Sequence, residues 1–181
     1  EIDLKYRKLP YIYRRLFDFK RPADASFFVK HQPHFETVSR AYELWQSDFP
    51  SSIAILGEKG SGRTTELNYL KDEIFSNDRV EEINFKKTIF TEAQILEEIS
   101  NQLKISNKKS IEEVVKLLMR RRKKTVIVVE NLQNCFLRTV NGYQAINALL
   151  YLISETKDNV LWVCSCSKYA WNFLNVEIGR A

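Results

Sequence analysis

The feature that most constrains the fold is a short apolar run that ends in glycines and is followed at once by a helical pattern. Residues 52–56 read Ser-Ile-Ala-Ile-Leu, the pattern of a strand buried on both faces. Three glycines then fall within residues 57–62, and residues 64–75 repeat apolar side chains at helical spacing. The sequence therefore predicts a strand, a glycine-rich loop and a helix in immediate succession.

The same alternation of strand and helix continues along the chain. Strands are expected at residues 80–85, 125–129 and 160–164, and amphipathic helices at residues 33–49, 92–103, 111–122 and 144–154. Such alternation predicts an α/β fold of three layers, in which helices cover both faces of a mainly parallel sheet. Ligands of such sheets bind at the carboxyl ends of the strands, where the glycine-rich loop is expected to lie.

The loop has the composition of a phosphate-binding loop. Residues 57–65 match the pattern GxxxxGK[ST] except that Arg63 replaces the lysine. Backbone N–H groups of such a loop, with the N-terminus of the next helix, hold a triphosphate. The residues expected to contact ATP or ADP with Mg²⁺ are Gly57, Glu58, Lys59, Gly60, Ser61, Gly62, Arg63, Thr64 and Thr65, with Thr64 on the metal. A ligand-free turn between strand and helix is the alternative, which the strand-loop-helix context outweighs.

From about residue 27 to its end, the chain resembles the AAA+ and STAND families of P-loop NTPases. GEKGSGRTT corresponds to their Walker A motif, VIVVEN at residues 126–131 to Walker B, and residues 28–31 to an adenine-side Val-Gly-Arg box. The resemblance implies an AAA+ ASCE-type sheet, Glu130 on Mg²⁺, and Ser165 or Ser167 as sensor 1. It also implies an N-terminal arm over residues 1–32 and a core over residues 33–181, a piece of a longer protein without the C-terminal lid.

The chain departs from the family pattern at three places in one site. Arg63 is planar where lysine is compact, and the adenine-side box has Lys30 and His31 in place of Gly-Arg. Glu130 and Asn131 replace the usual Asp-Glu pair, and Asn131 cannot accept a proton from water. General-base assistance contributes roughly a hundred- to ten-thousandfold.

We therefore expect a nucleotide-binding domain with impaired hydrolysis, which acts as a regulatory switch or assembly module beside other domains of its protein. Two alternatives stay open. One is an active Mg²⁺-dependent ATPase in which Glu130 compensates for Asn131. The other is a pseudo-ATPase scaffold that binds no nucleotide and serves protein or nucleic-acid contacts, for which pairing of Arg63 with Glu130 would be a sign.

A run of basic residues and a single arginine are candidates for contacts with a partner molecule. The run at residues 120–124 reads Arg-Arg-Arg-Lys-Lys, which fits either a nucleic-acid contact or, as we favour, a solvated helix end that complements the helix dipole. Arg138 fits either an arginine finger of a homo-oligomer or, as we favour, a surface salt bridge.

The cysteines, the net charge and the lengths of the apolar runs bear on metal binding, on partners and on location. Cys135, Cys164 and Cys166 are an odd number without CxxC spacing, so we expect core packing rather than zinc, and the tryptophans also fit core positions. The net charge of +5 is compatible with an anionic partner but modest for 181 residues. Because no long apolar run or signal-like start is present, we expect no membrane contact and a cytoplasmic location.

Overall fold

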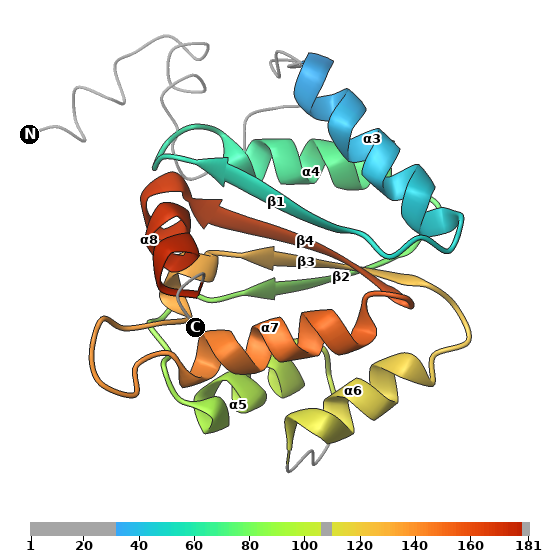
Figure 1. Ribbon diagram of the computed structural model, residues 1–181. Coiled ribbons are helices and arrows are strands. Elements are labelled where there is room, and N and C mark those ends of the chain that lie inside the picture. The colour runs from blue at the N-terminus through green and yellow to red at the C-terminus, as the bar shows by residue number, and fades with distance from the viewer. Residues whose placement is uncertain (1–31, 106–109, 179–181) are drawn as a thin grey trace, which may run out of the picture.

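The computed structural model describes residues 32–105 and 110–178, which form one β-sheet and the helices that cover it (Figure 1). The strands are β1 (Ser52–Gly57), β2 (Arg79–Asn84), β3 (Thr125–Glu130) and β4 (Val160–Ser167). The helices are α3 (Gln32–Gln46), α4 (Arg63–Glu73), α5 (Glu92–Gln102), α6 (Ile111–Met119), the short 3-10 helix η2 (Leu132–Asn134), α7 (Gln144–Thr156) and α8 (Lys168–Ile178).

The four strands are parallel and lie in the order β1-β4-β3-β2. Figure 1 shows α3 and α4 above the sheet and α5, α6 and α7 below it, while α8 lies at the end toward which the strands point. The expected three-layer α/β architecture is therefore confirmed. The carboxyl ends of all four strands meet at one edge, which we call the carboxyl edge, and the opposite edge is the amino edge.

Alternate side chains of the central strand β3 supply both halves of the core. Val126 and Val128 join the apolar cluster under α3 and α4, whereas Ile127 and Val129 join the cluster under α5, α6 and α7. All four side chains are at most 1% exposed. A run of β-branched residues without alternation is what a strand covered on both faces requires, so the prediction for this strand is confirmed.

Burial of β1 on both faces was a wrong expectation. Ile53 and Ile55 face the core, but Ser52, Ala54 and Leu56 are exposed, with Leu56 at 40%. Within the described residues β1 pairs on one side only, with β4, so it is an edge strand whose second face receives little cover. An apolar run cannot distinguish a central strand from an edge strand with small or tolerated apolar residues on the open face.

Helix and strand ends also differ from expectation by a few residues. Helix α6 ends at Met119 rather than at residue 122, and β4 continues to Ser167 instead of ending at residue 164. Helix α8 was not predicted. The burial of this helix is seen only in the folded structure. Ala170 and Leu174 belong to the core cluster that also contains residues of β4 and α7.

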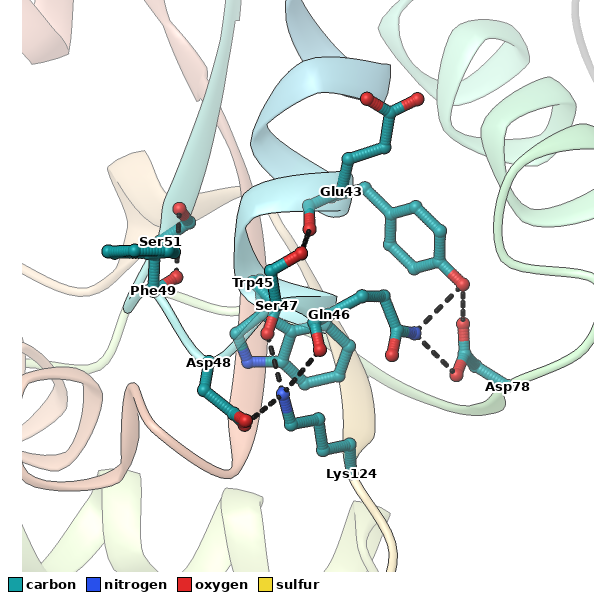
Figure 2. A network of polar contacts seen from close by, with 10 residues as sticks. Glu43, Trp45, Gln46, Ser47, Asp48, Phe49, Ser51, Asp78 and Lys124 are labelled. Atoms are coloured by element: carbon teal, nitrogen blue, oxygen red, sulfur yellow. Dashed lines mark hydrogen bonds and ion pairs between the residues drawn. The ribbon is translucent and has the colours of Figure 1, made fainter.

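The basic run at residues 120–124 follows α6 and has mixed roles, so a simple solvated helix end was a wrong interpretation. Arg121 forms an ion pair with Glu81 at 2.8 Å, and both side chains are largely buried. Lys124 donates to the backbone oxygen of Trp45 at 2.6 Å and pairs with Asp48 at 2.8 Å (Figure 2). Arg120, Arg122 and Lys123 are exposed at the amino edge.

The cysteines and two of the three tryptophans occupy the core, as expected. Cys135, Cys164 and Cys166 are free thiols in the cluster below the sheet. Burial raises the pKa of Cys164 to about 12, so this thiol stays protonated at neutral pH. Trp45 and Trp162 are fully buried, but Trp171 is only half-buried on α8.

Among residues 32–105 and 110–178, none of the helices combines the length and apolar character needed to cross a bilayer.

Candidate phosphate-binding site

The glycine-rich loop connects β1 to α4 at the carboxyl edge. Gly60 and Gly62 have φ values of 87° and 84°, the left-handed region that glycine adopts without strain. Gly62 is also the N-cap of α4 and has no side chain that could accept a hydrogen bond from the first turn of that helix. The N–H of Glu66 donates to the Gly62 oxygen at 2.9 Å, and the helix dipole favours an anion beside the N–H groups that precede it in this turn.

Arg63 opens α4 and folds its side chain back across the loop. A Cβ atom built on Gly57 would lie 3.2 Å from Arg63 Cγ and would displace the Ser61 hydroxyl, so the Arg63 side chain passes close to this glycine. Arg63 Nη1 is buried and has no hydrogen-bond partner among the described residues. Burial raises the pKa of the Cys166 thiol to about 11, and the nearby Arg63 charge acts in the opposite direction. The guanidinium thus lies beside the end of β4 with an unused donor.

Thr64 and Glu130 meet across the site. Thr64 Oγ1 donates a hydrogen bond to Glu130 Oε2 at 3.1 Å, although the two residues are 66 positions apart in the sequence. Thr64 lies in the first turn of α4, and Glu130 is the last residue of β3. The structure therefore brings together the two residues that the sequence assigned to Mg²⁺. No ion pair joins Arg63 to Glu130 within the described part of the chain.

The donor set at this point fits Mg²⁺. A threonine hydroxyl and a carboxylate are hard oxygen donors, and Mg²⁺ is usually held by one or two carboxylates with waters and substrate phosphates rather than by a full protein cage. Residues 32–105 and 110–178 contain no cluster of three His, Cys, Asp or Glu side chains suited to a metal. Bound between Thr64 and Glu130, the ion would neutralise phosphate charge.

Asn131 has a left-handed backbone and a fully engaged side chain. Its φ and ψ are 62° and 44°, a conformation that Asn adopts far more readily than Glu. Its Nδ2 donates to Asn84 Oδ1 at 3.0 Å, and its Oδ1 accepts from Gln133 Nε2 at 3.0 Å. The residue at the general-base position of the family pattern is thus a node in an amide network.

This network continues along the carboxyl edge to β4 and α8. Gln133 Oε1 accepts from the backbone N–H of Ser167 at 3.2 Å, and Ser167 Oγ accepts from the N–H of Ala170 at 3.2 Å. Ser167 therefore caps α8. Ser165, only 3% exposed, accepts from the backbone N–H of Asn131 at 3.4 Å. Ser165 lies nearer to the Walker B segment, and its sensor 1 role stays a prediction.

Toward β2, the network includes residues that the sequence did not mark as functional. Asn84 ends β2, and its backbone N–H and oxygen bond to the amide of Gln102 at 2.6 and 3.2 Å. Gln102 also donates to Glu98 at 2.9 Å. The only available signal was that Asn84, like Glu130, is a polar residue within one position of the end of a predicted strand. Gln133 and Gln102 carried no signal.

Arg138 does not form the salt bridge that we favoured. Its guanidinium carbon lies 3.9 Å from the ring centre of Phe173 and 5.4 Å from that of Tyr169, both on α8. None of the ion pairs within the described residues includes it. The aromatic side chains of α8, which the sequence analysis had not placed, satisfy this cation by cation–π contact.

Several predicted features lie outside the described residues. These are the adenine-side box at residues 28–31 and, apart from Gln32, the N-terminal arm expected at residues 1–32.

Comparison with models of known protein families and with curated proteins finds no match. Among solved structures, Cdc6p from Pyrobaculum aerophilum matches with a TM-score of 0.53 and 15% identity over 82% of this chain and 43% of that chain. The Drosophila ORC bound to AT-rich DNA and Cdc6 gives a TM-score of 0.45 and 17% identity over 82% and 56% of the two chains. PCH-2 of C. elegans gives 0.42 and 16% over 75% and 37%.

At these identities the similarity concerns the fold alone, and this chain spans about half the length of the proteins it matches or less. The parallel sheet, the loop between β1 and α4, and the match to Cdc6p agree with one another. The chain therefore shares the three-layer α/β fold of Cdc6p from Pyrobaculum aerophilum.

Proposed function

We propose that this domain binds a nucleoside triphosphate, ATP in the first place, at residues 57–65. The observation that carries the proposal is the buried Arg63 Nη1 without a partner. An unpaired buried donor on a cation costs free energy, and an acceptor atom of a ligand at this position would remove that cost. A phosphate oxygen is the matching acceptor, because it accepts strong charge-assisted hydrogen bonds from a guanidinium.

Hydrolysis is impaired in this proposal, and Asn131 is the reason. Its amide carries no basic group, and both of its polar ends are already bonded, to Asn84 and Gln133. The left-handed backbone at this position also disfavours Glu by roughly 1 kcal/mol, so the local conformation suits the residue present. Glu130 is bonded to Thr64, which fits a metal-side role better than activation of water.

The proposed role is a nucleotide-sensitive switch or assembly module, with other domains of the same protein or further copies of it as partners. The amide network supports this role because it joins the phosphate site to α8. From Asn131, the hydrogen bonds pass through Gln133 and Ser167 to the first turn of α8. A ligand that moves the Walker B segment therefore acts on a helix at the surface of the domain.

The test is calorimetric titration with ATP, ADP and GTP, with and without Mg²⁺, together with a phosphate-release assay. Arg63→Met removes the unpaired donor, and Arg122→Met is the matched control because it removes an exposed arginine at the amino edge. We expect ATP to bind wild type and the control equally, Arg63→Met to lose affinity, and no protein to release phosphate above background.

Two results would contradict parts of the proposal. Phosphate release that Glu130→Gln abolishes would show that Glu130 alone sustains an active ATPase. Absence of binding at millimolar nucleotide would favour a scaffold that retains only the architecture of the site.

A further inference from the structure

A second surface at the carboxyl edge combines exposed apolar side chains with cations. It consists of the loop at residues 137–142 and the first turns of α8, and we call it the loop-α8 surface. Val140 is 92% exposed and Tyr169 is 75% exposed, and Leu137 is 41% exposed. Arg138 joins the two parts because its guanidinium lies over the rings of Tyr169 and Phe173. In Figure 1 the loop between η2 and α7 and helix α8 lie at the same end of the sheet.

The loop is held in one conformation by its own backbone. Leu137 N–H donates to the Gly142 oxygen at 2.8 Å, and Gly142 N–H donates to the Thr139 oxygen at 3.0 Å. A Cβ atom at Gly142 would collide with the backbone oxygen of Leu137, so glycine is required for this closure. Val140 is thus presented at the tip of a turn that these hydrogen bonds close.

The base of the surface is equally well ordered. The ring of Phe136 stacks on that of Tyr143 and on that of Phe173, each with ring centres 6.0 Å apart and planes 9° apart. These contacts join the start of the loop, its end and α8. Arg138 therefore rests on an aromatic platform formed by Phe173 and Tyr169 of α8.

The charge of the surface has one sign. Residues 131–154 and 159–176, which include the loop and the described side chains of α8, contain no Asp or Glu, whereas Arg138 and Lys168 are basic. The cation–π contacts occupy the face of the Arg138 guanidinium, and no hydrogen bond or ion pair to a described residue occupies its edge. A guanidinium whose edge is open can bind a carboxylate through two parallel N–H···O hydrogen bonds.

The geometry points to a docking site for a protein segment that carries a carboxylate beside apolar side chains. Arg138 would bind the carboxylate, and Val140, Leu137 and Tyr169 would cover the apolar part. Aromatic residues and arginine are the side chains enriched in the energetic centres of protein interfaces. A nucleic acid fits less well, since backbone binding depends on many cations and this surface has two beside exposed aliphatic groups. The inference does not depend on nucleotide binding.

The experiment uses a random peptide library displayed on phage as the probe, selected against the full 181-residue chain. Selected sequences are then synthesised, and their affinity is measured by fluorescence polarisation. Val140→Ser and Arg138→Gln test the surface. Phe49→Ser and Arg122→Gln are the matched controls, because Phe49 is 62% exposed and Arg122 is exposed, both at the amino edge. Thermal unfolding of every variant verifies that it is folded.

We expect the selected peptides to contain Asp or Glu beside aliphatic or aromatic residues. Affinity should fall about 30-fold in each of the two test variants, the effect of losing a side chain at an energetic centre. It should stay unchanged in both controls and weaken as salt is added. Selection of peptides without carboxylates, equal binding to Val140→Ser, or failure to enrich any peptide would overturn the proposal. So would an oligonucleotide that competes for the same surface with higher affinity than the peptides.

Discussion

Arg63 and Lys124 are two partly buried cations at opposite edges of the same sheet, and their surroundings differ. At the amino edge, Lys124 donates to the backbone oxygens of Trp45 and Gln46 at 2.6 and 3.2 Å, pairs with Asp48, and lies 5.2 Å from the ring centre of Trp45 (Figure 2). At the carboxyl edge, Arg63 has a buried Nη1 with no partner among the described residues. One cation is fully satisfied by the fold and the other is not.

On the proposed function, the difference separates a residue that stabilises the fold, Lys124, from one that a ligand completes, Arg63. Lys124 donates hydrogen bonds to the last carbonyls of α3 and attaches that helix to the start of β3. These bonds stabilise the folded state. Arg63 contributes charge to a loop that leads directly into the N-terminus of α4, where the helix dipole favours an anion. Substitutions at the two positions should therefore have opposite consequences for stability and for binding.

The largest effect is expected at the amino edge. Lys124→Met leaves two carbonyl oxygens of α3 and the Asp48 carboxylate without their cation, so the free energy of unfolding should fall by about 3 kcal/mol. Urea denaturation measures this change. Nucleotide affinity should stay the same, and a loss of affinity without a loss of stability would break the comparison.

Arg63→Met should show the reverse pattern. It removes a charge that has an unsatisfied buried donor, so the free energy of unfolding without ligand should stay level or rise. Affinity for ATP should fall about 30-fold, since a hydrogen bond to a charged group contributes about 2 kcal/mol. Denaturation and titration of the same preparation test both halves. If Arg63→Met destabilised the free protein as strongly as Lys124→Met, Arg63 would be a structural residue.

The amide network should contribute more to the stability of the fold than to the affinity for a ligand. Asn131→Ala removes the bonds to Asn84 and Gln133 and leaves alanine in a left-handed conformation, so we expect a loss of about 1.5 kcal/mol. Asn131→Gly removes the same bonds but relieves the backbone, and should cost less. Equal stability of the two variants in urea denaturation would show that backbone strain plays no part.

The smallest effect concerns the second polar contact at the amino edge. Tyr42 donates to Asp78 at 2.6 Å, and Tyr42→Phe should cost about 1 kcal/mol. Burial, followed by the bond to Asp78, raises the pKa of Tyr42. A raised pKa means that stability is fully present below the unfolded value near 10 and is lost as the pH rises through the folded value. Stability measured in this alkaline range should therefore fall less steeply in Tyr42→Phe, and identical pH profiles would argue against the contact.

Most of the fold followed from local pattern. The β-branched run of β3 and the glycines before α4 each impose one structure on a short segment, so the P-loop frame and the parallel sheet were predictable. The edge position of β1 and helix α8 were not, because both depend on which neighbours cover a segment.

The site divides in the same way. The sequence by itself determined the glycine-rich loop, the position of Arg63 in it, and an amide at Asn131 directly after the Glu130 carboxylate, since each is a matter of residue type at a fixed spacing. Only the tertiary structure decided that Thr64 meets Glu130, that Asn131 bonds to Asn84 and Gln133, and that Arg138 stacks on α8. The physical reason is that hydrogen bonds and ring contacts act over a few ångströms between segments far apart in the chain, and only the packing of the sheet and its helices brings those segments together.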